Sequence, residues 1–292
     1  MGNSSSRHVF EVLRLVRAAG QPIGVTEVSR ALGLPTATAH RALATLEESG
    51  YVARYQSSAR YVMGPMVQGL MEAFFARFDL RDLAMPYLRT LALLTGESMS
   101  LLVPVGWYSV RVALVAGMNE VIHTGPLGET RPLTEGFGSQ ALLSTFPDAQ
   151  LDEILRAGPE LLDVGMAQAL RASVAEIRRR GYAFAALPIK PGYNAVSVPL
   201  RGNDPVASGA IVFEGPVLEA RPDGPPPALP LDWLRIIGEM EAHLRANPRR
   251  FENHYAHIDP RAISFGRSTG DRSAAPLQSR TRKPSRLHAG TR

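Results

Sequence analysis

Residues 25–55 read VTEVSRALGLPTATAHRALATLEESGYVARY, and this stretch decides the fold of the N-terminal part of the chain. Thr26 can cap a short helix, and Gly33 can end that helix in a left-handed turn. Pro35 supplies a preset φ for the first turn of a second helix, which we expect to run to Glu48. The pattern therefore predicts two short helices joined by a tight turn.

Two alternating segments follow Gly50 and flank a polar turn. Residues 51–54 and 60–63 are predicted to form a β-hairpin. Upstream, the apolar side chains of residues 8–19 lie on one stripe of a helix, which predicts an amphipathic helix that packs under the second helix. Three helices followed by a hairpin are typical of a winged helix-turn-helix.

The first turn of the second helix carries small and polar side chains. A recognition helix reads the major groove, about 12 Å wide, with its N-terminal residues, while basic side chains hold phosphates. The residues expected to contact DNA are Thr26, Thr36, Ala37, Thr38, His40, Arg41, and the wing residues Arg54 and Arg60. The alternative is a three-helix module that binds only protein, which leaves the basic wing without a purpose.

These residues resemble the signature of the IclR family of bacterial transcriptional regulators. The similar segments are residues 33–43, GLPTATAHRAL, then 50–52, GYV, and 61–64, YVMG. Ala37 stands where a hydroxyl is common in the family, and Thr36 where lysine is frequent. The resemblance implies an α+β protein with an N-terminal winged helix-turn-helix, a linker helix and a C-terminal GAF-like mixed α/β effector-binding domain.

Composition excludes several classes of site. The chain has 292 residues, of which 45% are hydrophobic and 20% charged, which is enough for two domains with their own cores. It contains no cysteine, which excludes disulfides, thiolate metal sites and cysteine nucleophiles. No apolar run approaches the roughly 20 residues of a membrane span, and the N-terminus lacks the apolar core of a signal peptide. We therefore expect a cytoplasmic protein without membrane contact.

Charge is distributed unevenly along the chain. Residues 1–63 hold seven arginines against four glutamates, a charge of +3, and residues 261–292 hold seven arginines and one lysine against Asp271, a charge of +7. Since the total is +5, the middle carries −5. A basic head suits contact with phosphate. The basic tail is either a second, sequence-independent attraction to DNA or a solvated end.

These patterns suggest five segments. They are a disordered start (1–7), a DNA-binding domain (8–64), a linker helix (65–78), an effector-binding and oligomerisation domain (79–250) and a disordered basic tail (251–292). The helix Met66–Phe78 is apolar on more than one face, so it is either buried or paired with its twin. We favour pairing, as a homodimer or homotetramer, because paired heads read paired half-sites.

Periodicity predicts further helices and strands in the C-terminal part, arranged on a mixed sheet. The expected helices are 80–94, 136–145, 148–156, 166–180 and 233–246; the expected strands are 98–105, 109–117, 120–123, one starting at 181–184, 195–200 and 208–214; and 125–132 is a loop.

No sequence motif indicates catalysis. A G-x-S-x-G elbow, a Walker loop and a zinc-type histidine pair are all missing, and His254-x-x-His257 is best read as a chance pair. We therefore expect no catalytic residues, no metal and no cofactor. An enzyme fused to a DNA-binding domain stays a weaker alternative, and so does an architectural DNA-binding protein whose second domain only dimerises.

The resemblance also implies where an effector binds: beside the loop that precedes the Gly136 helix and on the last three strands. By position, the corresponding residues are His123, Gly136, Phe137, Gly138, Ala195 and Glu214. Phe137, together with Ala185 where relatives commonly carry acids, suggests a pocket with few cations that suits a larger, apolar or aromatic effector. In this interpretation His123 and Glu214 orient the effector. The alternative is that these residues fill a core.

Overall fold

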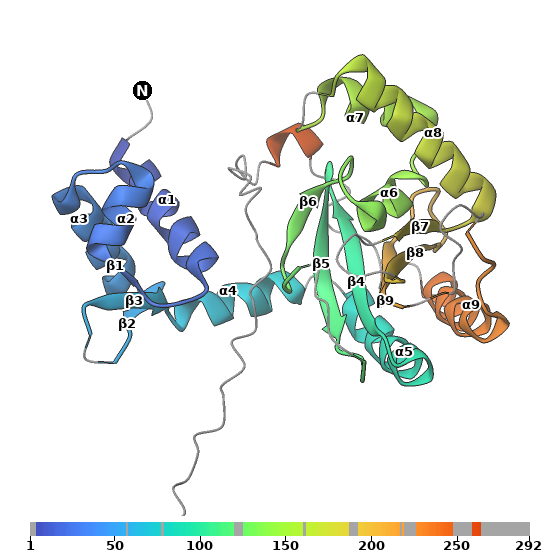
Figure 1. Cartoon of the computed structure of the whole chain (residues 1–292), viewed down its shortest axis with the longest axis horizontal. Helices are drawn as coiled ribbons and strands as arrows, with labels where there is room; N and C mark the ends of the chain where they lie inside the picture. Colours follow the sequence, from blue (N-terminus) through green and yellow to red (C-terminus); the bar gives the residue numbers. More distant parts are fainter. Residues whose placement is uncertain are drawn as a thin grey trace, which may run out of the picture.

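The computed structural model describes residues 4–56, 58–76, 79–119, 125–159, 162–186, 192–216, 218, 226–247 and 259–263. Its helices and strands form two parts that are joined by helix α4, residues Met66–Phe75 (Figure 1). One hydrophobic cluster is built only from residues between Val9 and Met63, and two others only from residues between Phe74 and Ile263. Each part therefore has its own core.

The N-terminal part is a winged helix-turn-helix, as the sequence predicts. Its elements are α1 (Ser4–Ala19), β1 (Ile23–Gly24), α2 (Val25–Leu32), α3 (Thr36–Glu48), β2 (Val52–Arg54) and β3 (Arg60–Met63). β3 pairs antiparallel with β2 on one side and with β1 on the other. Val12, Val28, Leu43 and Tyr61 are buried together between the helices and the hairpin.

Two local predictions in this part are wrong. α1 begins at Ser4, so the expected disorder does not extend over Ser4–Arg7. Thr26 is not a helix cap, because α2 already begins at Val25, and the backbone N–H of Gly24 donates instead to the carboxylate of Glu27 at 2.7 Å. This contact is the acidic half of a capping box, in which the third residue of the helix accepts a hydrogen bond from the N–H of the residue before the helix.

The C-terminal part is built on one six-stranded sheet. Its elements are α5 (Asp79–Thr95), β4 (Ser98–Val105), β5 (Tyr108–Val115), β6 (Thr130–Pro132), α6 (Phe137–Leu143), α7 (Asp148–Ala157), α8 (Val164–Arg180), β7 (Ala183–Ala186), β8 (Asn194–Leu200), β9 (Gly209–Gly215), α9 (Leu231–Ala246) and a 3-10 helix (Pro260–Ala262). The strand order is β6-β5-β4-β9-β8-β7, and every neighbouring pair is antiparallel. The α+β class is confirmed, whereas the expectation of mixed strand directions is wrong.

Helices cover both faces of this sheet (Figure 1). Because side chains alternate along a strand, Met99, Leu101 and Val103 of β4 join the cluster that contains α5 and α9. Leu102 points the other way and joins the cluster that contains α6, α7 and α8. The ring of Phe213 stacks on that of Trp233 with centroids 4.5 Å apart, which fastens α9 to β9.

Three segments differ from the sequence prediction. The expected loop 125–132 contains β6, and the 3-10 helix lies inside the expected disordered tail. The linker helix ends at Phe75. The expected strand 120–123, with His123, and the last two residues of the expected linker helix lie outside the described residues.

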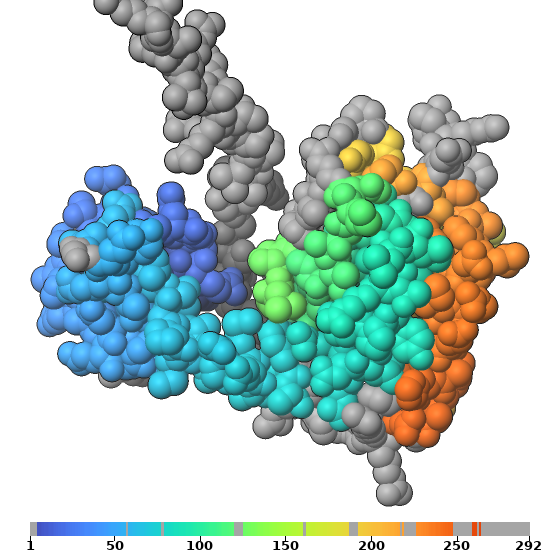
Figure 2. Space-filling model, turned by 90° about the horizontal axis from the view of Figure 1, so that it is seen from below, coloured from blue at the N-terminus to red at the C-terminus, as the bar shows by residue number. Residues whose placement is uncertain are grey.

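α4 leaves its apolar side chains in solvent. None of its residues is buried, and Met66, Leu70 and Met71 are 52%, 55% and 42% exposed. The alternative of a buried helix is therefore wrong for the single chain. Figure 2 shows this helix in the narrow connection between the two larger bodies. Within the described ranges, no helix is both long and apolar enough to cross a membrane.

Candidate DNA interface and effector cavity

The leading turn of α3 is turned outward. Thr36, Ala37, His40 and Arg41 are exposed and Thr38 is half-buried. The opposite stripe of the same helix, Ala39, Ala42, Leu43 and Leu46, is buried in the N-terminal core. The backbone N–H groups of Thr38 and Ala39 donate to the carbonyl of Pro35. These hydrogen bonds begin the helix directly after Pro35. The predicted DNA contacts on α3 therefore lie on the side of the helix that faces away from the core.

Arg41 is loosely held within that surface. Its Nε lies 3.4 Å from the carbonyl oxygen of Ala37, which is long for a hydrogen bond. Its side chain lies along the exposed face of the helix. A guanidinium in this setting can turn toward a phosphate or a base at little cost.

The two wing arginines have intramolecular partners that the sequence did not indicate. Nε of Arg54 lies 3.0 Å from Oε1 of Glu47. Nη2 of Arg60 lies 2.9 Å from both carboxylate oxygens of Glu27, and its Nε donates to the carbonyl of Pro22 at 2.8 Å. The N–H of Gly24 and then Arg60 hold the pKa of Glu27 below its usual value. Arg60 therefore joins the wing to the start of α2, besides being exposed.

The predicted effector residues do not all line one space. Gly138 packs α6 against the sheet, since a Cβ there would lie 2.6 Å from Cδ1 of Leu102. Ala195 is fully buried and lies opposite Glu214 in the register of β8 and β9. Gly136 precedes α6 with φ of 76°, a conformation that favours glycine. For Gly138 the role is packing.

Glu214 belongs to a buried ion cluster. The side chain of Arg111 on β5 is only 6% exposed, and its Nη2 lies 3.7 Å from Oε1 of Glu214 and 3.4 Å from Oε2 of Glu129. Nη1 of Arg111 donates to Oγ of Ser100 at 2.5 Å. Arg111 was not predicted from the sequence, although an arginine in the middle of an apolar strand indicates a buried ion pair.

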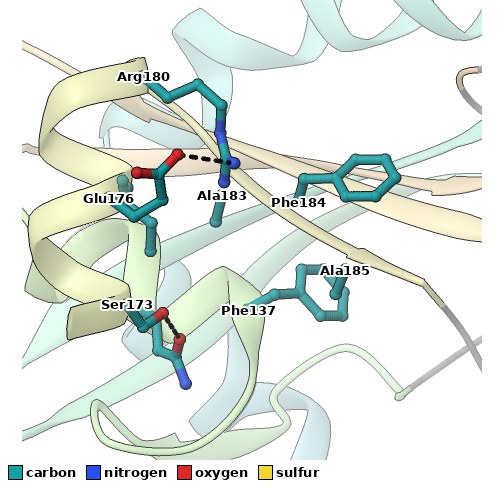
Figure 3. Close-up of a pocket in the computed structure, with 9 residues that line it drawn as sticks. Phe137, Ser173, Glu176, Arg180, Ala183, Phe184 and Ala185 are labelled. Carbon is teal, nitrogen blue, oxygen red and sulfur yellow. Dashed lines mark hydrogen bonds and ion pairs between the residues drawn. The ribbon is translucent and has the colours of Figure 1, made fainter. Parts of the chain in front are cut away.

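A cavity of about 330 Å³ lies between α6, α8 and β7 (Figure 3). Its lining comprises Phe137, Gln140, Ser173, Glu176, Ile177, Arg180, Ala183, Phe184 and Ala185. Among the predicted effector residues, Phe137 is part of this lining. Ala185, which was also expected beside the pocket, is part of it too. Arg180 is the one cationic side chain of this lining and Glu176 the one acidic side chain.

The polar residues of the cavity are linked to one another. Oγ of Ser173 donates to Oε1 of Gln140 at 2.8 Å, and Nη1 of Arg180 lies 3.5 Å from Oε1 of Glu176 (Figure 3). Glu176 has a closer partner in Arg179, at 2.7 Å, and this contact is the main reason why its pKa is lowered. The cavity therefore combines an apolar wall with a charged edge on α8.

Comparison with known families assigns both parts of the chain. The model of the IclR helix-turn-helix domain matches residues 7–55. The model of the bacterial transcriptional regulator IclR C-terminal domain matches residues 72–221, about half of the chain.

Individual relatives agree with this assignment. The glycerol operon regulatory protein of Streptomyces griseus is 26% identical over 221 residues, 74% of this chain and 85% of the relative. The HTH-type transcriptional regulator XynR of Escherichia coli K12 is 23% identical over 202 residues, 67% of this chain and 79% of the relative. Both relatives are regulators.

Solved structures share the fold. An IclR homologue from Microbacterium hydrocarbonoxydans matches 84% of this chain and 99% of its own with a TM-score of 0.64 at 20% identity. A regulator from Rhodococcus sp. RHA1 matches 84% of this chain and 98% of its own with a TM-score of 0.63 at 22% identity. With both domain models matched in order, and with a winged helix-turn-helix followed by an α+β domain, the chain belongs to the IclR family of bacterial DNA-binding transcriptional regulators.

Proposed function

We propose that this regulator binds operator DNA as a homodimer or homotetramer and that a small molecule in the cavity between α6, α8 and β7 changes its operator affinity. The observation that carries the proposal is the cavity of about 330 Å³, because this volume lies within the range of small-molecule sites. The DNA contacts that we propose come from Thr36, Ala37, Thr38, His40 and Arg41 on α3, with Thr26, Arg54 and Arg60 beside them. We propose that the regulator acts in the bacterial cytoplasm, where its operator is.

A ligand-bound relative supports an effector site in this fold. The Microbacterium hydrocarbonoxydans homologue was crystallised as a complex with 4-hydroxybenzoate. In the present chain Phe137 offers an aromatic wall, and Ala183 and Ala185 leave room beside it (Figure 3). The proposed effector therefore has an apolar or aromatic body, and 4-hydroxybenzoate is a reasonable first compound to assay.

The proposed response is a shift between two arrangements of the DNA-binding heads. A ligand can move such an equilibrium only by its differential affinity for the two arrangements. A tenfold difference changes operator affinity by at most tenfold, so a modest effector still gives a measurable response. α4 joins head to body, so any change in spacing passes through it.

Fluorescence anisotropy with DNA from upstream of the protein's own gene tests the proposal. Operator affinity is measured with and without an extract of small metabolites, and then with 4-hydroxybenzoate. We expect the extract to change the dissociation constant severalfold. Ala185→Trp should fill the cavity and abolish the response while operator binding persists. Ala186→Trp, at the exposed end of the same strand, is the control and should keep the response.

Operator binding that never responds to extract would favour the architectural alternative, in which the second domain only dimerises. Loss of operator binding in Ala185→Trp would instead mean that the substitution disturbs the fold, and Gln140→Trp would then be used to fill the same cavity from α6.

A further inference from the structure

We propose that the exposed face of α1 is a second DNA-binding surface, which holds the sugar-phosphate backbone of a duplex segment other than the one contacted by α3. This surface, which we call the α1 stripe, consists of Arg7, Phe10, Arg14 and Arg17. It lies outside the contacts proposed above for α3 and the wing, and it binds DNA without regard to sequence.

The four side chains of the stripe lie along one side of α1. They are separated by three, four and three positions, and such spacings return to the same side of an α-helix because about 3.6 residues complete one turn. All four are exposed, and Phe10 is 67% exposed. Val12 and Val16, on the opposite side of the helix, are buried in the N-terminal core. Since each residue adds about 1.5 Å, the stripe is roughly 15 Å long.

The wing arginines contribute little free charge to the head, residues 1–63. Nε of Arg54 lies 3.0 Å from a carboxylate oxygen of Glu47, and Nη2 of Arg60 lies 2.9 Å from one of Glu27. A paired arginine attracts phosphate less than a single one does, because the neighbouring carboxylate repels the phosphate. The net charge of +3 on the head therefore comes from its other arginines.

Most of that charge lies on α1. Its three arginines are opposed by a single carboxylate, Glu11, so the helix carries +2 of the head's +3. Arg30 on α2 adds one positive charge, and on α3 the charge of Arg41 is balanced by that of Glu48. The helix expected to read bases thus adds little attraction for phosphate, whereas α1 presents a concentrated positive charge.

The arginines of the stripe are available for a ligand. Among the described residues, Arg7, Arg14 and Arg17 have neither a hydrogen-bond nor an ion-pair partner, although Glu11 lies on the same helix. A guanidinium presents paired N–H donors in one plane, which matches phosphate oxygens. Since the chain belongs to a family of DNA-binding regulators, DNA is the polyanion that this surface meets.

Phe10 gives the stripe an apolar contact between its charges. It lies one turn after Arg7 and one turn before Arg14, with about two-thirds of its side chain exposed. Proteins contact both the phosphates and the sugars of a DNA backbone. A ring between two guanidinium groups can lie against deoxyribose while the arginines hold the phosphates on either side.

The stripe and the leading turn of α3 lie on different sides of the head (Figure 1). α1 and α3 pack against each other through buried residues of one core cluster, among them Val12, Val16 and Leu43. Both exposed faces are turned away from that core. The major groove, about 12 Å wide, admits one helix, and a short duplex is too stiff to bend around the head because the persistence length of DNA is about 150 base pairs. The stripe therefore contacts a second segment of DNA.

Fluorescence anisotropy with two duplexes tests the proposal on the full-length protein. The protein is first saturated with an unlabelled operator duplex of about 30 base pairs, which is too short to bend around the head. A labelled duplex of unrelated sequence is then added. We expect the labelled duplex to bind, with an affinity that falls as salt rises because phosphate contacts release counterions. A second duplex that does not bind to the operator-saturated protein would overturn the proposal.

A triple variant assigns the binding to the stripe. Arg7→Gln, Arg14→Gln and Arg17→Gln in one protein should weaken binding of the second duplex about tenfold or more and lower its salt slope by about 0.9 for each lost phosphate contact. Operator affinity should stay within about twofold, because charges beyond about 8 Å are screened at physiological salt. The matched control replaces three exposed arginines of the C-terminal domain by glutamine, at positions 89, 156 and 235, and should bind the second duplex as the parent protein does. Equal losses in both triple variants would overturn the proposal.

Glu11→Gln adds a measurement that misfolding cannot imitate. It removes the one acidic residue of α1 and should strengthen binding of the second duplex severalfold. Second-duplex binding that is unchanged both in this variant and in the triple variant of the stripe would overturn the proposal.

Sedimentation velocity on the triple variant of the stripe tests the competing occupant, a second copy of the chain. We expect its oligomeric state to equal that of the parent protein. A variant that loses its oligomeric state but still binds the second duplex would make the stripe an interface between copies and overturn the proposal. Operator affinity and its response to metabolite extract are measured separately, so the operator and effector proposals do not depend on this result.

Discussion

Arg41 is exposed and has no ion pair with a carboxylate among the described residues, unlike the wing residues Arg54 and Arg60. Its weak contact to Ala37 leaves the guanidinium available, whereas Arg54 and Arg60 must first exchange a carboxylate for DNA. We therefore expect Arg41→Ala to weaken operator binding most. If Arg41 contacts a phosphate, the slope of log affinity against log salt should fall by about 1; if it reads a base, one base pair should lose about 1–3 kcal/mol of discrimination.

Anisotropy titrations over a series of salt concentrations, on operator and on single-base variants, separate these outcomes. Arg89→Ala, an exposed arginine on α5, is the matched control and should behave as the parent protein. An Arg41→Ala protein that keeps both its salt slope and its base preference would mean that α3 does not read DNA with its leading turn.

Glu27 should make the stability of the head depend on acid. Its pKa is lowered in the folded protein, first by the N–H of Gly24 and then by Arg60. The stabilisation is therefore present above the pKa of the unfolded chain, about 4.5, and is lost as pH falls through the lower folded value. We expect the melting temperature of Glu27→Gln to be lower near neutral pH and to vary less below about pH 4.5 than that of the parent protein.

Differential scanning fluorimetry between about pH 3 and 7 measures this difference. Glu48→Gln, an exposed glutamate on α3, is the control for loss of one negative charge. Parallel curves for Glu27→Gln and the parent protein would show that neither the N–H of Gly24 nor Arg60 favours the charged form of Glu27 in the folded protein.

At the scale of elements, the exposed apolar side chains of α4 indicate that another surface covers this helix in the assembled protein. A helix with three large side chains about half exposed is costly in water, and a second copy of the helix would cover them. We expect the protein to dimerise, and Leu70→Glu to weaken the dimer at least tenfold because it places a charge in the contact. Sedimentation velocity at micromolar concentration measures both.

The control for this substitution is Gln68→Lys, which also adds a charge but lies beside Glu72 on the same helix. It should leave the dimer intact, since an opposite charge one turn away supports the helix. A monomeric parent protein, or a dimer indifferent to Leu70→Glu, would place the interface elsewhere.

Elements were predictable from the sequence where they are long enough to show a period. α3, α8 and α9 repeat apolar residues at helical spacing, and their expected bounds are within two residues of the observed ones. β1 and β6 have two and three residues, too few for an alternation to be visible, and they form because longer strands offer them an edge.

The candidate site was less predictable, for a related reason. Phe137 was expected in the pocket because, by position, it corresponds to effector-lining residues of the family at the start of this helix. Arg180 was not, because its role depends on α8 packing beside β7 and on Arg179 taking the nearer place at Glu176. The pairs of Glu176 with Arg179 and Arg180 have helical i,i+3 and i,i+4 spacing and are visible in the sequence. The packing of α8 beside β7 joins residues through the tertiary fold and leaves no such local pattern.

At the scale of the whole molecule, the two parts carry net charges of opposite sign. The head carries a charge of +3 while residues 64–260 carry −5, so of these two parts only the head attracts DNA by its charge. The C-terminal segment alters this balance. Arg261 lies 2.5 Å from Glu153 on α7, and Ile263 packs beside Gly106 in the turn between β4 and β5. Residues 261 and 263 are thus held against the C-terminal domain.

We expect removal of residues 264–292 to weaken DNA binding without changing its sequence preference. The deleted segment holds seven basic residues against Asp271, and it leaves the contacts of Arg261 and Ile263 in place. Each phosphate contact that is lost should reduce the salt slope by about 0.9, and affinity for operator and unrelated DNA should fall by the same factor. A protein with the same tail residues in scrambled order should bind as the parent does, since charge rather than sequence is responsible. Unchanged affinity at low salt after truncation would leave the tail as a solvated end, with DNA attraction confined to the head.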